Sequence, residues 1–176
     1  MDNQLLSTAL ASKAAYAGAF LFTVLVILFN TMPQNILPIA VVAVAFHVIL
    51  FPVVAELPST DWARAGGYGW LILDIAANIM QLNGVDEHTR SALHYGAHIP
   101  AVIWIITASL KTNPAMRLVG IPQAIIMGSY SFVEPQAPGW YLYPAMVLLI
   151  VWLVLTGRSL NRNTARSCSL QIVQPV

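Results

Sequence analysis

The polar side chains most able to do chemistry in this chain lie inside long apolar stretches. One stretch carries Trp70, Asp74 and Asn78 at intervals of four, a spacing that places all three on one face of a helix. A carboxylate near the middle of a membrane costs about 2.5–3.5 kcal/mol on insertion scales. No Lys or Arg lies at a matching depth. We therefore expect Asp74 to face the protein interior, partnered by His47, by Gln123 or by a bound cation.

Two histidines form a second candidate group. His94 and His98 are four residues apart, so a helix places both imidazoles on one face, and Pro100 follows two residues later. A proline inside a helix removes one backbone donor and frees the carbonyl four residues before it, here that of Gly96. Irregular backbone at membrane depth is tolerated within protein or along a cavity. The pattern predicts that these histidines lie inside the protein or along a cavity.

Metal or haem ligation is one chemistry that such imidazoles permit. Histidines four apart can share a metal ion, but the His-Glu-x-x-His pattern is absent. His47, near the middle of another apolar stretch, would supply two axial haem ligands if paired with His98. The acidic segment from Asp86 to Arg90 matches no metal-ligand spacing. The sequence assigns no metal site and leaves the cofactor open, with haem or a metal ion as the alternatives.

Composition requires that membrane-embedded helices position these groups. Of the 176 residues, 58% are hydrophobic and 9% are charged, whereas about 25% are charged in an ordinary soluble domain. Roughly 20 residues cross a hydrocarbon core, and only helices satisfy their own backbone groups there. The sequence predicts an all-α integral membrane domain, residues 1–157, built as a bundle of six transmembrane helices with short loops. The spans are about 14–30, 36–55, 67–83, 91–110, 115–133 and 141–157.

The connection between the second and third spans is predicted to be more than a turn. Thr60 and Asp61 are typical of a helix N-cap, and Gly66 and Gly67 are typical of a helix end. We expect a short helix along the membrane surface here, carrying Trp62 and ending at the glycines.

The basic residues orient the bundle. With six spans, seven of the eight Lys and Arg residues fall on the side of both termini, and Arg90 alone falls on the other side. The positive-inside rule then predicts cytoplasmic N- and C-termini, with a bacterial inner (plasma) membrane as the expected location. Residues 158–176 would form a basic cytoplasmic tail, in which Arg158, Arg162 and Arg166 share one helical face against anionic lipid.

Helix direction arranges the polar set as a column. At 1.5 Å per residue, Asn78 and His98 lie roughly 8 and 10 Å below the outer surface, and His47 and Gln123 lie near the midplane. This column predicts a pocket open to the extracytoplasmic side rather than a channel. Its expected ligand-binding residues are Trp70, Asp74, Asn78, His94, His98, Gln123 and Tyr130. Its catalytic candidates are Asp74, His47 and His98.

The first and last helices are predicted to serve packing. Ala11, Ala15 and Ala19 recur every four residues, which lets helix backbones approach closely, either within the bundle or against a second membrane protein. The run from Met146 to Leu155 in the last span has no polar residue. We expect it to form a lipid-facing wall or a contact between copies of the chain.

The size, the six helices and the cytoplasmic termini resemble the substrate-capture components of energy-coupling-factor vitamin transporters. The resemblance is one of architecture. In that family alanines of the first helix dock on a coupling protein, which is the role that the resemblance implies for Ala11, Ala15 and Ala19.

Missing motifs narrow the function. Gly-x-Ser-x-Gly, Walker A and dinucleotide fingerprints are absent, and a net charge of +1 without a basic patch excludes a general nucleic-acid binder. Three hypotheses remain. The preferred one is a pocket that binds a small molecule or a lipid, and transport is one function that such a pocket would serve. The alternatives are a membrane-embedded enzyme or redox protein, using Asp74 with His47 or His98 on a lipid or quinone, and an accessory subunit of a membrane complex.

Overall fold

The computed structural model describes residues 2–134, 136–138 and 140–172. Every regular element in this part of the chain is a helix, which confirms the all-α prediction. The elements are α1 (Asp2–Thr31), α2 (Ile36–Ile49), α3 (Phe51–Glu56), α4 (Asp61–Leu82), α5 (Glu87–Lys111), α6 (Pro114–Val133) and α7 (Tyr143–Ile172). α3 follows α2 after an interruption at Leu50, with Pro52 in its first turn, so the two form one rod.

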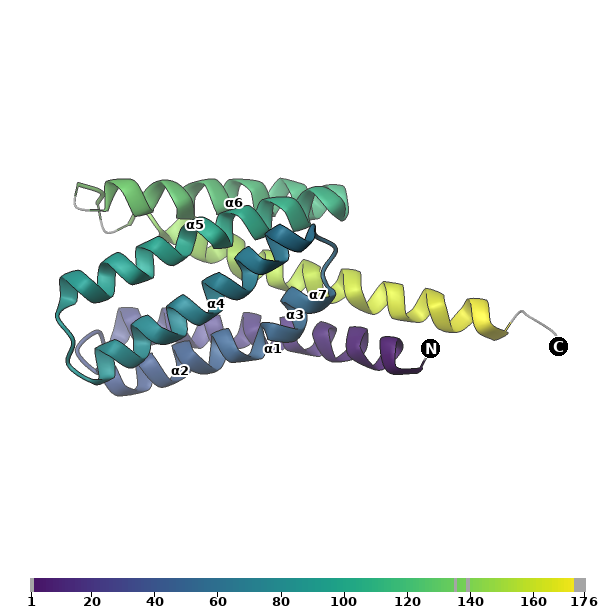
Figure 1. Ribbon diagram of the computed structural model, residues 1–176, viewed down its shortest axis with the longest axis horizontal. Coiled ribbons are helices and arrows are strands. Elements are labelled where there is room, and N and C mark those ends of the chain that lie inside the picture. The colour runs from purple at the N-terminus through teal and green to yellow at the C-terminus, as the bar shows by residue number, and fades with distance from the viewer. Residues whose placement is uncertain (1, 135, 139, 173–176) are drawn as a thin grey trace.

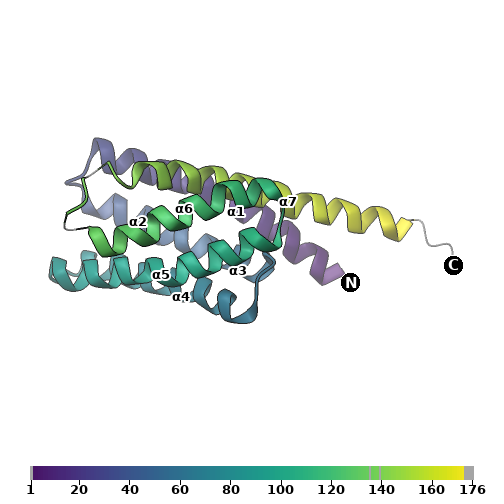
Figure 2. The same cartoon turned by 90° about the horizontal axis from the view of Figure 1, so that it is seen from above.

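The helices form a closed ring in which each rod contacts the next. α1 packs on α2, α2 on α4, α4 on α5, α5 on α6 and α6 on α7, and α7 closes the ring against α1. Short connections explain this order because they keep sequence neighbours side by side and antiparallel. Both ends of the chain lie at the same end of the bundle (Figures 1 and 2). The ring leaves an interior that all the rods share.

Four of these rods are long and apolar enough to cross a membrane. They are Leu6–Thr31, Ile36–Glu56, Glu87–Lys111 and Tyr143–Arg162. α4 and α6 fall outside this group, and both carry polar side chains that are buried among the other helices, Asp74 on α4 and Gln123 on α6. The length and composition of the four apolar rods support a membrane protein.

α4 corrects the prediction of a short surface helix that ends at two glycines. One helix runs through Gly66 and Gly67 without a break. A Cβ atom on Gly66 would lie 3.0 Å from the Pro100 carbonyl oxygen, and one on Gly67 would lie 2.8 Å from Cγ1 of Val54. These glycines therefore permit the close approach of α5 and α3 to α4, and they do not end a helix.

α5 and α6 each continue through an internal proline, Pro100 and Pro122. Each helix is started by a side-chain cap. Asp86 and Asn113 accept hydrogen bonds from backbone N–H groups three residues later, at 2.9 and 3.1 Å. Such caps satisfy donors that the first turn of a helix leaves unpaired, and they fix where the two helices begin.

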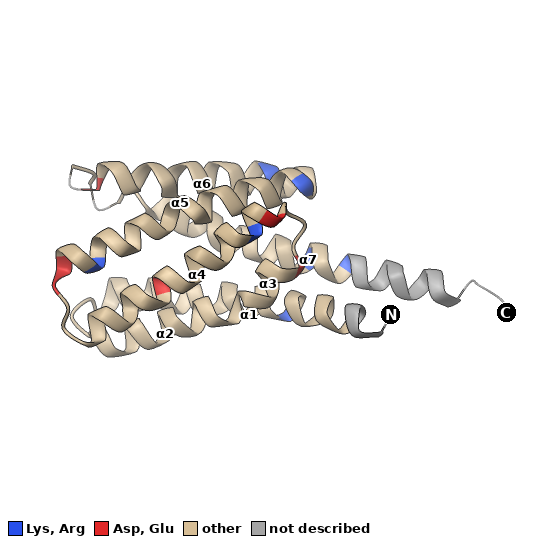
Figure 3. Cartoon of the chain, in the orientation of Figure 1, with Lys and Arg blue, Asp and Glu red and all other residues tan. Residues whose placement is uncertain are grey.

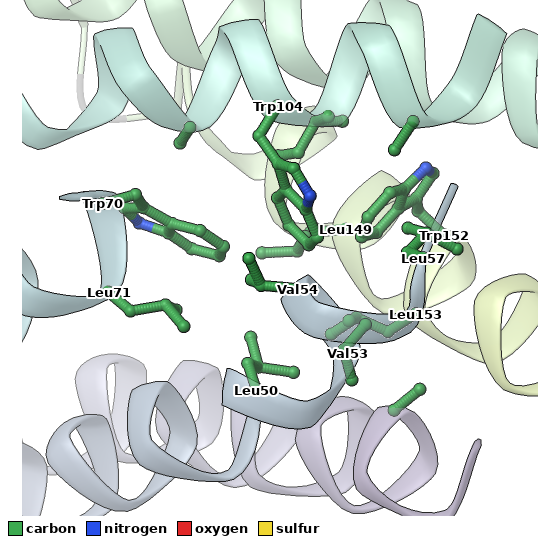
Figure 4. Close-up of a cluster of buried hydrophobic side chains, with 14 of the residues drawn as sticks. Leu50, Val53, Val54, Leu57, Trp70, Leu71, Trp104, Leu149, Trp152 and Leu153 are labelled. Carbon is green, nitrogen blue, oxygen red and sulfur yellow. The ribbon is translucent and has the colours of Figure 1, made fainter. Parts of the chain in front are cut away.

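A tightly packed aromatic and aliphatic core fills the half of the bundle that contains α3. Trp104 lies between Trp70 and Trp152, with ring centroids 5.9 and 5.4 Å apart. Figure 4 shows these indoles above the aliphatic side chains of α3 and α7. On α6, a Cβ atom on Gly120 would collide with the Ser109 hydroxyl and would lie 2.5 Å from Nε1 of Trp152. This half has no room for additional atoms beside Gly120.

α1 and α7 pack along each other through small residues. Ala11, Ala15 and Ala19 are all buried, and the Ser12 hydroxyl donates a hydrogen bond of 2.8 Å to the carbonyl of Gly157 on α7. Of the two predicted alternatives, these alanines therefore pack within the bundle of this chain. Docking a second protein on the same alanines would require α1 to separate from its neighbours.

α7 is not the uniform lipid-facing wall that its sequence predicts. Trp152 and Leu153 are fully buried, whereas Val147 and Val151 are exposed, so one face belongs to the core and the other is free. The helix continues past residue 157 to Ile172, so the predicted basic tail begins as helix. The side chain of Arg166, part of the predicted basic face, lies outside the described residues.

Candidate functional site

Asp74 is the centre of the site, and its side chain is 3% exposed. Its Oδ2 atom accepts a hydrogen bond from Trp70 Nε1 at 2.6 Å and lies 3.1 Å from Nε2 of His47. Its Oδ1 atom lies 2.7 Å from Nδ1 of His94. The Asn78 amide donates to the Asp74 backbone carbonyl at 2.8 Å. Three helices, α2, α4 and α5, therefore converge on one carboxyl group.

These contacts determine how many protons the cluster holds. His47 Nδ1 lies 2.7 Å from the Ala43 carbonyl oxygen, which can only accept, so Nδ1 carries a hydrogen. The contact between His47 Nε2 and Asp74 then needs a further proton, on either the imidazole or the carboxyl group. The contact between His94 and Asp74 needs one more. With the His94 ring neutral, the cluster has no net charge.

His98 and Gln123 extend the polar wall onto α5 and α6. His98 Nδ1 lies 3.1 Å from the Ser131 hydroxyl, and its ring contacts that of His94 with centroids 5.0 Å apart. Gln123 is 1% exposed, and its Nε2 atom donates to the sulfur of Met127 at 3.6 Å. Its carbonyl oxygen, Oε1, is buried and has no hydrogen-bond partner among the described residues. A buried acceptor left in this state costs about 1–3 kcal/mol.

A cavity of about 140 Å³ lies against this polar wall. Its polar lining consists of His47, Trp70, Asp74, Asn78, His94, His98 and Gln123. Its apolar lining consists of Phe22, Leu25, Phe29, Ala43, Phe46, Met127, Leu142, Ala145, Met146 and Leu149. Every rod of the ring thus contributes to it. The volume is close to that of an engineered cavity of about 150 Å³ that binds benzene, and it is well below the roughly 300–1,000 Å³ of sites for drug-sized ligands.

The cavity lies toward the end of the bundle opposite the chain termini. Phe29 and Asn78 come from the last turns of α1 and α4, and His94 comes from the second turn of α5. Figure 1 shows that these helix ends meet away from the N and C labels. The His94 side chain is 36% exposed. The polar cluster therefore runs from an accessible imidazole to a buried carboxyl group.

A second hollow, of about 410 Å³, lies between α5 and α6. Tyr95 and Glu134 line it, and the Tyr95 hydroxyl donates a 3.2 Å hydrogen bond to the Glu134 carboxylate. Ser131 lines this hollow, while its hydrogen-bond partner His98 lines the cavity. The His98–Ser131 pair is therefore part of the partition between the two spaces.

Most of the predicted ligand-binding residues come together around the cavity. Trp70, Asp74, Asn78, His94, His98 and Gln123 all line it. Tyr130 does not, and it lies instead between Tyr95 and Tyr141, with ring centroids 5.6 and 5.8 Å away. Of the predicted partners of Asp74, His47 contacts it, whereas the Gln123 amide bonds to Met127. His94, which the sequence does not pair with Asp74, is its second imidazole partner.

The apolar wall is not predicted by the sequence. α1 contributes Phe22, and α7 contributes Leu149, although both helices are expected from their sequences to serve only packing and lipid contact. No residue type distinguishes these side chains from ordinary core residues. Only the closure of the ring by α7 against α1 brings them opposite the polar wall.

The haem and metal hypotheses meet a geometric obstacle at His47. Both of its ring nitrogens are already engaged, one by the Ala43 carbonyl and the other by Asp74, so neither has a free lone pair for iron. In the part of the chain that the structure describes, no group of three or more His, Cys, Asp or Glu side chains is arranged to hold a metal ion.

Comparison with known proteins does not indicate a function, so the functional argument depends on the geometry of the site. No protein-family model, curated protein or solved structure matches this chain.

Proposed function

We propose that this chain is a membrane protein with six spans and cytoplasmic termini that binds a small molecule in the cavity beside Asp74. The cavity would open to the extracytoplasmic side, as the capture step of transport requires. Support comes from the polar wall, which lies within a bundle of apolar helices. Polar groups at such depth are costly, so their concentration around one cavity favours a binding role.

Gln123 carries this proposal. Its Oε1 atom is a buried acceptor without a partner among the described residues, and the residue lines the cavity. A glutamine retained only for packing would gain stability by replacement with an apolar residue, since the unpaired acceptor is unfavourable. A molecule in the cavity that donates a hydrogen bond would satisfy this atom. Asp74, by contrast, already has both oxygens engaged.

The proposed topology is supported by the distribution of charge. Most Lys and Arg positions lie toward the end of the bundle that carries both termini (Figure 3), whereas Arg90 lies in the first turn of α5, at the opposite end. That pattern agrees with the positive-inside rule for cytoplasmic termini. α4 and α6 complete the six spans in this proposal, because their polar groups face the protein interior and not lipid.

Cysteine labelling tests the topology. In a Cys168→Ser background, Glu87→Cys at the first residue of α5 should react with a membrane-impermeant maleimide in right-side-out vesicles. Thr112→Cys, between α5 and α6, should react only after the membrane is permeabilised. Equal labelling of both positions from outside would contradict the six-span arrangement.

Native mass spectrometry of protein purified in mild detergent tests the binding. We expect a discrete bound mass on the wild-type protein and its loss from Ala145→Leu, because Ala145 is buried and lines the cavity. Val147→Leu is the matched control, because Val147 is exposed on the same helix. Ala43→Leu repeats the test from α2. A wild-type protein without any bound molecule, or one that keeps it in both cavity variants, would contradict the proposal.

A further inference from the structure

We infer that the ligand is an uncharged molecule of single-ring size whose hydroxyl or N–H group donates a hydrogen bond to Oε1 of Gln123. A phenol or a comparable ring alcohol is the chemical class that fits. This inference rests on the proposed function and narrows it, because it states what the cavity selects.

The charge of the lining disfavours an ionic ligand. Among the described residues, no Lys, Arg or Glu lines the cavity, and Asp74 supplies its one carboxyl group. The contacts of Asp74 with His47 and His94 require a proton in each, and with a neutral His94 ring this cluster has no net charge. A charged ligand would lose its water without finding an opposite charge, and that transfer is strongly unfavourable.

The orientation of the Gln123 amide determines whether the ligand donates or accepts the hydrogen bond. Its Nε2 group donates to the Met127 sulfur, which can only accept. This orientation leaves the carbonyl oxygen as the free end of the side chain, and that oxygen is the buried atom without a partner among the described residues. A ligand that contacts this oxygen must therefore bring a donor, and an acceptor such as a ketone would not satisfy it.

The volume of the cavity and its apolar lining determine the rest of the ligand. The cavity volume is about 140 Å³, and an apolar cavity of about 150 Å³ accommodates benzene. Phe22 and Phe46, whose rings lie 5.1 Å apart, line the side contributed by α1 and α2. Leu149 lines the side contributed by α7. A single apolar ring fills this space, and a fused-ring or haem-sized molecule exceeds it.

Fluorine NMR with 4-fluorophenol and fluorobenzene tests the inference on the whole chain in detergent micelles. The wild-type protein should bind 4-fluorophenol saturably, and Gln123→Leu should bind it about tenfold more weakly, as expected for one hydrogen bond. Fluorobenzene lacks the donor, so its affinity should be the same for both proteins. Gln123→Met repeats the loss with a flexible side chain, and circular dichroism verifies that both variants are folded.

Other outcomes would overturn the inference. Equal binding of 4-fluorophenol by wild type and both Gln123 variants would show that the carbonyl does not select a donor. Tighter binding of 4-fluorobenzoate or 4-fluorobenzylammonium than of 4-fluorophenol would show that the cavity selects charge. If none of these probes binds while the wild-type protein still retains a molecule that Ala145→Leu loses, the ligand class is wrong and the proposed function stands. If no molecule is retained either, both fail.

Discussion

The two halves of this bundle use buried space in opposite ways. Around Trp104 and Trp152 the helices are in such close contact that Gly120 has no room for a methyl group. Around Asp74 the bundle contains a cavity, and polar side chains from several helices line it. The cavity is therefore not a consequence of loose packing throughout the bundle. The half near α3 provides rigidity, and the other half provides a site.

Trp70 is the residue that joins the two halves. Its indole N–H donates to Asp74 in the polar cluster, and its ring packs against Trp104 in the apolar core. The core therefore positions a hydrogen-bond donor of the site. This arrangement places a ligand cavity on rigid helices, which hold side-chain geometry better than loops do.

The largest expected effect comes from removing the carboxyl group of the polar half. Asp74→Ala leaves His47, His94 and Trp70 facing an empty position inside the bundle. Breaking a buried pair in this way costs about 3–5 kcal/mol. Thermal unfolding in detergent micelles, followed by circular dichroism, measures the loss. A change as small as that of an exposed carboxylate variant would show that the cluster does not stabilise this half.

The next largest effect tests the tightness of the other half. Gly120→Ala should destabilise the protein by about 1–3 kcal/mol, because the added methyl group would collide with Ser109 and Trp152. Gly96→Ala is the matched control, since nothing lies within 4 Å of a Cβ atom there. It should be neutral or stabilising, because alanine favours a helix over glycine by about 1 kcal/mol. Equal melting temperatures for both variants would remove the contrast between the halves.

A smaller effect separates the two roles of Trp70. Trp70→Phe should lose about 1 kcal/mol more than Trp104→Phe, the value of a typical hydrogen bond. Both changes shorten an aromatic side chain in the same stack, but Trp104 Nε1 is buried without a partner among the described residues. The difference in melting temperature between the two variants isolates the bond to Asp74. If Trp104→Phe is the more damaging change, the bond contributes less than ring packing.

The smallest effect comes from the exposed carboxylate of Asp86, the N-cap residue of α5. The hydrogen bond from the Thr89 backbone N–H lowers the pKa of Asp86 below its ordinary value of 3.8. A lowered pKa in the folded state stabilises the protein at neutral pH, and this contribution is lost as the pH falls from about 3.8 through the lowered value. Asp86→Ala should therefore melt slightly below the wild type at pH 7 and converge with it at low pH. A constant difference across this range would contradict the assignment.

Hydropathy and helical spacing are enough to predict much of the architecture. Each predicted span falls largely on one rod of the ring, and the main error lies where Gly66 and Gly67 suggest a helix end. A glycine pair has the same sequence signature whether it ends a helix or allows another helix to approach. Only the contacts with Pro100 and Val54 distinguish the two. Six spans and their orientation remain predictions.

The polar wall is predictable because polar residues are conspicuous in apolar helices, and the four-residue spacing of Trp70, Asp74 and Asn78 fixes their common face. The pairing of His94 with Asp74 depends on α4 and α5 being neighbours at that depth, which spacing along one helix does not reveal. The opposite wall is not predictable, since a phenylalanine such as Phe22 has the sequence signature of a core or lipid-facing residue. Whether the polar set binds a ligand also remains a prediction.

Thermal unfolding of wild type and Gln123→Leu, each with and without 4-fluorophenol, tests whether the Gln123 carbonyl binds a ligand in the cavity. A ligand that binds only the folded state stabilises it by an amount that increases with the logarithm of one plus the ratio of the free ligand concentration to Kd. Without the phenol, Gln123→Leu should melt at or above the wild type, because the variant lacks a buried acceptor that has no partner among the described residues. With the phenol, the wild-type melting temperature should rise more than that of the variant, which binds the phenol about tenfold more weakly. A variant that melts well below the wild type, and that the phenol stabilises to the same degree, would show that Gln123 serves packing and that its carbonyl does not bind the ligand.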